Sequence, residues 1–378
     1  MNRKLVFFPL VAALSFSLSA APGIATGEQA SWRILERAMV AFDSGKYGAA
    51  LALAEQAREQ KRINYEGYAQ TLTRAMIPQE VQRAGDDIPA VIAVLESRQD
   101  REALRIITFY AEAKGVGFFD RRVTGMIDFL RQSSVFPEAD LLIGRVYRHE
   151  GELDLAKQYC LRAWEQSFAL DVPDQKYDIL YQLADLAEIT GDEELLEQSL
   201  LLVLAEDPYF NDAAGAVEGA EGGASFYDSL RNALGRNYSV DRIFEMYRVD
   251  SYRSLEAYAG LSRLYRDRGD NGRFLKTAIL GSLSAFTRMY EVLTARNVDY
   301  SYRGVGDFFT RALRYRDVTD WSLEHPVWGC FNYLSEAAER NSLGGFAGEI
   351  DALLEAFSPD RAVGDTARVR AESRGGVM

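Results

Sequence analysis

The sequence predicts an all-α protein, on three observations. From Trp32 to Phe357, apolar residues recur at spacings of three and four, the period of helices that bury one face. Alternating runs typical of strands are nearly absent, and short groups of Gly, Asp, Asn or Ser separate the apolar blocks. Several blocks begin with a helix-start signal. Asp192, for example, can cap free amide groups, while Glu193 and Glu194 favour the positive end of a helix.

The composition is that of a folded, acidic protein. Hydrophobic residues make up 48% of the chain and charged residues 26%. Only 9 prolines and 2 cysteines occur, which excludes a Pro-rich linker system and a disulfide scaffold. The net charge of -13 repels phosphate backbones, so we expect no nucleic-acid partner.

The N-terminus has the pattern of a secretory signal peptide, residues 1–25. The basic Arg3 and Lys4 precede the apolar run Leu5–Leu18, and small residues follow it. Cleavage after Ala25 or after Gly27 fits the small residues before each bond. A retained membrane anchor is the alternative, but the run is shorter than the ~20 residues that a spanning helix needs. We therefore expect an exported protein, periplasmic in a diderm bacterium or otherwise secreted.

The clearest internal repeat unit lies between Leu142 and Ala163. It places small or aromatic residues at regular positions, namely Gly144, Tyr147, Gly151, Ala156 and Ala163. This pattern resembles the tetratricopeptide repeat, a pair of antiparallel helices joined at a glycine turn. In such a pair, small side chains let the helices approach and the aromatic residue fills the space beside them.

Three further segments repeat the pattern less fully: Trp32–Gln60, Leu183–Val203 and Leu261–Ala278. The turn glycines of the four units are Gly45, Gly151, Gly191 and Gly269. The resemblance implies an α-solenoid of antiparallel helix pairs over residues 26–210 and 226–357. Four glycines in residues 211–225 indicate a Gly/Ala-rich loop between these arrays. Residues 358–378 lose the apolar periodicity and are expected to form a disordered tail.

Residues suited to catalysis are scarce. The two histidines, His149 and His325, are far apart in the chain, so a multi-histidine metal site is excluded. We expect His149 to be solvated at a helix end and His325 to lie in a connecting loop before Pro326. Cys160 and Cys330 fit core packing. The chain has no phosphate-binding GxxxxGK[ST] motif and no complete dinucleotide fingerprint. The sequence therefore predicts no enzyme activity, no metal and no cofactor.

The repeat resemblance implies a scaffold or adaptor of the cell envelope that binds a protein or peptide in a concave groove. In the family, the groove is lined by the first helix of each pair. The positions that match in this sequence are Leu141, Arg145 and Arg148, then Asp178, Tyr181, Asp185 and Glu188, and finally Glu256, Ala259, Arg263 and Arg266. The asparagine typical of repeats that clamp carboxylate tails is absent from these positions.

Two questions about the binding residues stay open at this stage. The arginines at groove positions either bind carboxylates of a partner or pair with nearby acids such as Glu256 and Asp267. The loop containing Tyr300, Tyr302 and Arg303 either packs or forms a contact surface. The alternative function is a soluble small-molecule or glycan binder that uses the tyrosine-rich C-terminal half. An enclosed aromatic pocket would favour the small-molecule or glycan binder, and an open groove with patterned charge would favour a protein partner.

Overall fold

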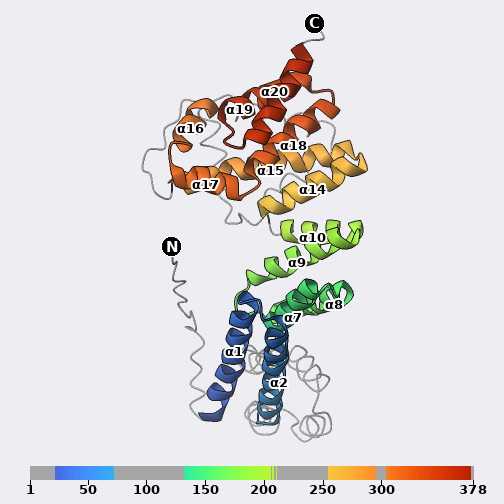
Figure 1. Ribbon diagram of the computed structural model, residues 1–378, viewed down its shortest axis with the longest axis vertical. Coiled ribbons are helices and arrows are strands. Elements are labelled where there is room, and N and C mark those ends of the chain that lie inside the picture. The colour runs from blue at the N-terminus through green and yellow to red at the C-terminus, as the bar shows by residue number, and fades with distance from the viewer. Residues whose placement is uncertain are drawn as a thin grey trace, which may run out of the picture. The chain divides into compact units, whose positions relative to one another are not determined.

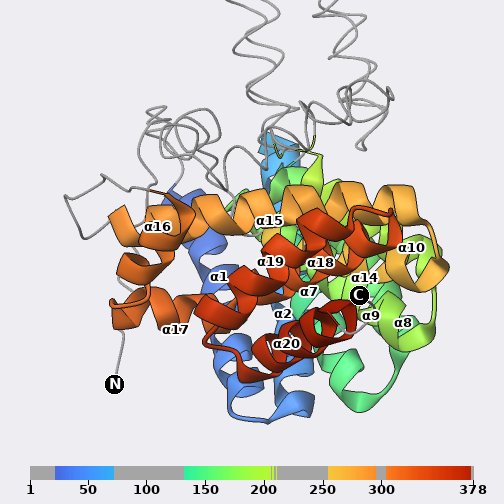
Figure 2. The ribbon, with the colours of Figure 1, turned by 90° about the horizontal axis from the view of Figure 1, so that it is seen from above.

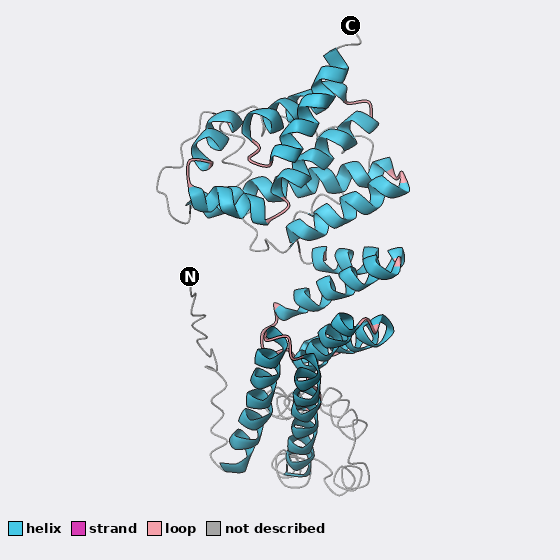
Figure 3. Cartoon of the chain, viewed as in Figure 1, coloured by secondary structure: helices cyan, strands magenta, loops and turns pink. Residues whose placement is uncertain are grey.

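The computed structural model describes residues 22–71, 132–205, 207, 210, 254–294 and 304–375. Within these ranges every regular element is helical, with 13 α-helices, one short 3-10 helix and no strand (Figures 1 and 3). The all-α prediction is confirmed. The chain divides into two compact units, residues 1–179 and 180–378, with the boundary inside helix α9 (Gln175–Thr190).

The described part of unit 1 contains two helix pairs and a short connection. Its elements are α1 (Pro22–Asp43), α2 (Tyr47–Thr71), α7 (Pro137–Glu150), α8 (Leu153–Glu165) and the 3-10 helix Ser167–Ala169. Small residues of α1 and α2, among them Ala38, Ala54 and Ala57, share a core with Phe136 and Ile143. These alanines are fully buried, and because their side chains are small, the helices can approach closely.

The other helices that the structure describes beyond α9 belong to unit 2. They are α10 (Glu193–Leu204), α14 (Ser254–Arg268), α15 (Asn271–Thr294), α16 (Val305–Ala312), α17 (Arg316–Glu324), α18 (Val327–Arg340), α19 (Gly344–Phe357) and α20 (Arg361–Gly375). Helix α15 packs between α14 and α18, and α18, α19 and α20 then pack in succession (Figure 2). Unit 2 contains a cluster of aromatic rings around Phe309. The centroid of the Phe309 ring lies 5.3 Å from that of Phe286 and 5.6 Å from those of Trp328 and Phe357.

The four predicted turn glycines each join two helices. Their φ angles are 72° at Gly45, 82° at Gly151, 72° at Gly191 and 73° at Gly269. This left-handed conformation is unfavourable for residues that have a Cβ atom, and glycine adopts it readily. In every case the residue after the glycine donates its N–H to the carbonyl five residues earlier, at 2.9 Å. These are Schellman turns, in which glycine ends one helix and starts the next.

Close helix approach explains another predicted small residue. A Cβ atom at Gly144 of α7 would lie 2.7 Å from Sγ of Cys160 on α8. Cys160 is fully buried, and burial raises the pKa of its thiol to about 12. The expected core role of this cysteine is therefore supported by its packing.

Two further expectations are settled by the described residues. The prediction of a disordered tail over residues 358–378 is wrong for Arg361–Gly375, which form α20. His149 is exposed as expected, but its ring stacks on Tyr47 at 4.7 Å and meets the edge of Phe42 at 5.3 Å.

Some expectations fall where the structure gives no description. Residues 1–21 of the predicted signal peptide, the loop 211–225, and Tyr300, Tyr302 and Arg303 lie outside the described residues. Among the helices that are described, none is both long enough and apolar enough to cross a membrane.

Candidate binding cleft

A cleft of about 520 Å³ opens in unit 2. One wall is a face of α14, the second is the corner between α17 and α18, and the third is the start of α20. Leu323 and Glu324 on its rim are exposed, and most other lining residues are partly exposed. The cleft is therefore open to solvent at this rim.

The α14 wall combines two small residues with two charged ones. Glu256, Ala259, Gly260 and Arg263 are spaced so that all four share one helix face. Ala259 and Gly260 keep this face low. A Cβ atom at Gly260 would also lie 2.8 Å from a methyl of Leu200, so glycine lets α10 approach α14.

His325 fixes the second wall to α14. Its backbone is extended, with φ -114° and ψ 157°, as is favoured for a residue before proline. This conformation ends α17, and the imidazole Nδ1 lies 2.8 Å from Oε1 of Glu256. The ring of Trp321 lies 4.8 Å from the His325 ring. The predicted connecting-loop position of His325 is confirmed, and its partner Glu256 is 69 residues away.

The floor of the cleft is aromatic. Trp328 is 2% exposed, packs against Phe309, and donates its indole N–H to Oγ of Ser322 at 3.1 Å. Tyr333 is half-buried, with the guanidinium of Arg266 at 5.4 Å from its ring centre. Burial raises the pKa of Tyr333, although Arg266 acts in the opposite direction, so its hydroxyl stays protonated and can donate a hydrogen bond.

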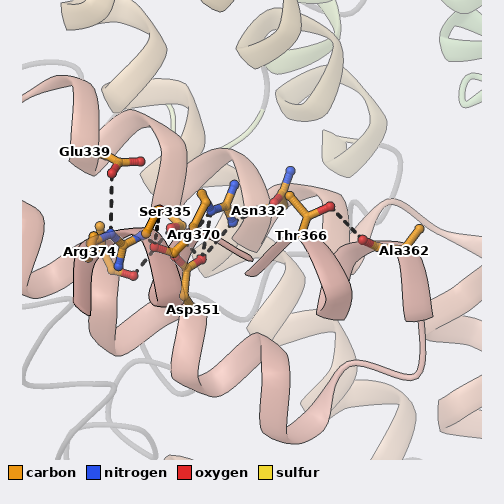
Figure 4. Close-up of polar contacts among 10 residues, drawn as sticks. Asn332, Ser335, Glu339, Asp351, Ala362, Thr366, Arg370 and Arg374 are labelled. Carbon is orange, nitrogen blue, oxygen red and sulfur yellow. Dashed lines mark hydrogen bonds and ion pairs between the residues drawn. The ribbon is translucent and has the colours of Figure 1, made fainter. Parts of the chain in front are cut away.

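The third wall is held by a charge cluster behind it. Asp360 and Val363 line the cleft at the start of α20. Asp360 caps this helix, since its Oδ1 accepts from the N–H of Ala362 at 3.0 Å. Farther along α20, Arg370 and Arg374 both bind the buried Asp351 of α19 (Figure 4). The wall therefore depends on polar contacts made outside the cleft.

The charges of the cleft have a slight acidic excess. Glu256, Glu324 and Asp360 line it together with Arg263 and His325. Arg263 donates from Nη2 to Glu188 of α9 at 2.8 Å, in a pair whose side chains are 43% and 51% exposed. Exposed pairs of this kind contribute little stability, about 0–1 kcal/mol, so Arg263 remains available to another carboxylate.

The geometry of the cleft is suited to binding and does not supply an activated nucleophile. The hydroxyl of Ser322 donates to the Thr319 carbonyl at 2.8 Å, so its proton is not directed at His325. Burial raises the pKa of the Cys330 thiol, and Glu256 adds to this effect. No group of three or more potential metal-ligating side chains is found in the part of the chain that the structure describes.

The predicted binding residues are divided between the two units. Arg145 and Arg148 are half-buried on α7 of unit 1, whereas Arg263 and Arg266 lie on α14 of unit 2. Tyr181 is half-buried on α9. Arg263 lines the cleft. Arg266 instead pairs with Asp267 at 2.8 Å and packs on Tyr333.

The alternative that the groove arginines pair with nearby acidic residues agrees in part with the structure. Arg266 binds Asp267 as that alternative expected, but Arg263 binds Glu188 and Glu256 binds His325. Trp328, Glu324 and Asp360 also line the cleft and were not predicted as binding residues. Glu324 ends α17, Trp328 lies in α18 and Asp360 precedes α20, and the three share no local motif, so the fold brings them together.

Comparison with known proteins gives relatives without a described function. The chain is 28% identical to an uncharacterized protein of Treponema pallidum over 312 residues, 82% of each chain. It is 20% identical to an uncharacterized protein of Borreliella burgdorferi over 244 residues, 61% of this chain and 75% of that protein. No protein-family model matches the chain. The 312-residue similarity is longer than either compact unit, so it includes parts of both.

Proposed function

We propose that this chain is a non-catalytic binding protein built of tetratricopeptide-like helix pairs, and that its cleft receives a peptide segment of a partner protein. One observation carries the proposal. Three of the groove positions that the repeat resemblance assigns to the last pair, Glu256, Ala259 and Arg263, line the same cleft. They do so on the first helix of a glycine-turned pair, where the repeat family binds its ligands.

The repeat architecture is supported by local geometry at four places. The helix pairs around Gly45, Gly151, Gly191 and Gly269 share one turn conformation and one hydrogen-bond pattern. The close packing of Gly144 on Cys160 is the kind of contact for which the repeat conserves small side chains.

The form of the cleft favours a peptide. Its rim is open and charged, and a chain can enter and leave along an open groove, whereas small molecules are usually enclosed. The second candidate is a small-molecule or glycan binder. It is favoured by one observation, since 520 Å³ falls within the roughly 300–1,000 Å³ typical of small-ligand sites.

The proposed location is outside the cytoplasm, in the periplasm or the medium. The support is the signal-like order of residues 1–25 in the sequence. A partner of the cell envelope is then the expected occupant of the cleft.

A peptide-display selection on the purified protein tests the proposal. A Cβ atom at Gly329, which lines the cleft, meets nothing within 4 Å, so a side chain here starts in open space and Gly329→Leu should fill part of the cleft. Gly345→Leu is the matched control, because Gly345 is also unobstructed and does not line the cleft. Selected peptides should bind wild type and Gly345→Leu with equal affinity and lose at least tenfold in affinity for Gly329→Leu.

The same experiment separates the two candidate functions. Peptides that bind all three proteins equally would remove the cleft from the proposal. A selection without binders, together with a set of small molecules that raise the melting temperature of wild type but not of Gly329→Leu, would favour the small-molecule binder.

A further inference from the structure

We propose that the cleft selects a peptide by two opposite charges, with a basic side chain bound at Glu256 and Glu324 and an acidic side chain bound at Arg263, about two helical turns apart. This inference rests on the proposed function and names the class of peptide. Its basis is the distribution of charges in the cleft, where Glu256 and Arg263 lie on α14 and Glu324 ends α17.

The separation of the two charged ends follows from α14 itself. Glu256 and Arg263 share one helix face and are seven residues apart, which corresponds to about 10.5 Å along the axis at 1.5 Å per residue. In an extended polyproline II segment, residues three apart lie on one side and are separated by about 9 Å. A peptide of the form basic-x-x-acidic, read in either chain direction, therefore spans the two ends.

The acidic end has unused capacity for a cation. Glu256 binds His325 through Oε1, and its second oxygen, Oε2, is buried and has no hydrogen-bond donor among the described residues. Glu324 lies on the rim, where it is exposed and has no ion pair among the described residues. Two carboxylates beside one histidine leave this end negative in either protonation state of the imidazole. A lysine or arginine side chain is the complementary group.

The basic end has unused donors. Arg263 uses one N–H on Nη2 for Glu188, and a guanidinium has five N–H groups. The existing pair is exposed, so a ligand carboxylate can join it or replace Glu188 at small cost. Between the two ends, the α14 wall carries the small residues Ala259 and Gly260.

Fluorescence anisotropy with labelled peptides of blocked termini tests this inference on the purified full protein. Four peptide pools carry mixed residues at the two x positions and fixed charges at the outer positions: Lys-x-x-Glu, Lys-x-x-Lys, Glu-x-x-Glu and Gln-x-x-Gln. At low salt the Lys-x-x-Glu pool should bind at least tenfold more tightly than each other pool. The preference should fall as salt is raised, because it is electrostatic.

A charge exchange gives the sharper test. Arg263→Glu should lower the affinity for Lys-x-x-Glu at least tenfold and raise the affinity for Lys-x-x-Lys above the wild-type value. Arg314→Glu, an exposed arginine outside the cleft, is the matched control and should change neither value. Arg263→Gln, which removes the charge without reversing it, should give intermediate affinities, and the melting temperature of each variant checks that the fold is intact.

The outcomes distinguish this inference from the proposed function. If all four pools bind equally and Gly329→Leu still abolishes binding, charge selection is wrong and the peptide cleft stands. If Arg263→Glu does not exchange the preference, Arg263 is not the basic end. If none of the pools binds and the display selection also fails, both proposals are overturned.

Discussion

Asp351 and Arg370, from neighbouring helices, form an ion pair in which the carboxylate is 0% exposed and Nη2 of Arg370 lies 2.7 Å from its Oδ1 (Figure 4). Arg374 binds the other oxygen, and Ser335 of α18 donates to Oδ1 at 2.7 Å. Among residues 361–374 of α20, whose burial is described, only Ala367 is buried. Charge, more than apolar area, therefore holds α20 against α18 and α19.

Asp351→Ala should detach α20. The substitution leaves Arg370, Arg374 and Ser335 without their shared acceptor, and breaking a buried pair from one side costs about 3–5 kcal/mol. Hydrogen exchange should show lost protection over Arg361–Gly375, and chemical denaturation should show lower stability of unit 2. Arg368→Ala on the same helix is the control, because its pair with Asp365 is exposed and its loss should change stability by less than about 0.5 kcal/mol. Equal protection of α20 in both variants would contradict this account.

The Gly269 turn gives a prediction about backbone conformation. Gly269→Ala places a Cβ atom on a residue with φ 73°, which should destabilise by about 1–2 kcal/mol. Gly272→Ala is the nearby control, since its Cβ would make only ordinary contact at 3.8 Å and alanine favours the helix by up to about 1 kcal/mol. Urea denaturation should therefore shift in opposite directions for the two variants. A shift in the same direction would mean that the turn tolerates a side chain.

Gly144 gives the matching prediction about packing. Gly144→Leu should destabilise by about 1–3 kcal/mol, because even its Cβ would meet Cys160 Sγ at 2.7 Å. Gly48→Leu is the control: Gly48 is exposed in α2 and its Cβ would meet nothing within 4 Å. If denaturation of the two variants gave the same midpoint, the close approach of α7 and α8 would not contribute to stability.

The features that sequence analysis predicted are those with a local cause. Each turn glycine is identified by its neighbours in the chain, and Asp192 caps α10 through the amide of Leu195, three residues away at 3.1 Å. The small residue Gly144 was found because the repeat motif has a fixed spacing. Such signals lie within one helix pair, and a single sequence contains them.

The features that were missed depend on distant residues or on charge. Glu256 meets His325 only because α14 and the α17–α18 corner pack together, and nothing near either residue indicates the other. Helix α20 was predicted to be disordered because its apolar periodicity is weak. It is ordered by Arg370 and Arg374 on Asp351, and hydrophobic periodicity does not detect contacts of that kind.

The last prediction concerns pH and Asp140 of α7. This carboxylate is 3% exposed, with Nε of Arg58 at 3.1 Å and Nη1 of Arg162 at 3.8 Å from Oδ1. Burial raises the pKa of Asp140 to about 6. Arg58 and, to a smaller extent, Arg162 act in the opposite direction and lower this pKa. Its pKa in the unfolded chain is about 3.9. Between these values the folded protein binds the proton more tightly than the unfolded chain does.

The sign of the pH dependence follows from that order. The contribution of Asp140 is most favourable below about pH 4, falls as pH rises to about 6, and is constant above, for a total of roughly 2–3 kcal/mol. Asp140→Asn cannot titrate, so its stability relative to wild type should rise by that amount between pH 4 and pH 7. Urea denaturation at pH 4, 5, 6 and 7 measures the difference, with Asp154→Asn on the exposed start of α8 as the control. If the difference in stability between Asp140→Asn and wild type does not vary with pH, the two arginines outweigh burial. NMR titration of the Asp140 carboxyl would then give a pKa near or below 4, because nearby positive charges lower the pKa of an acid.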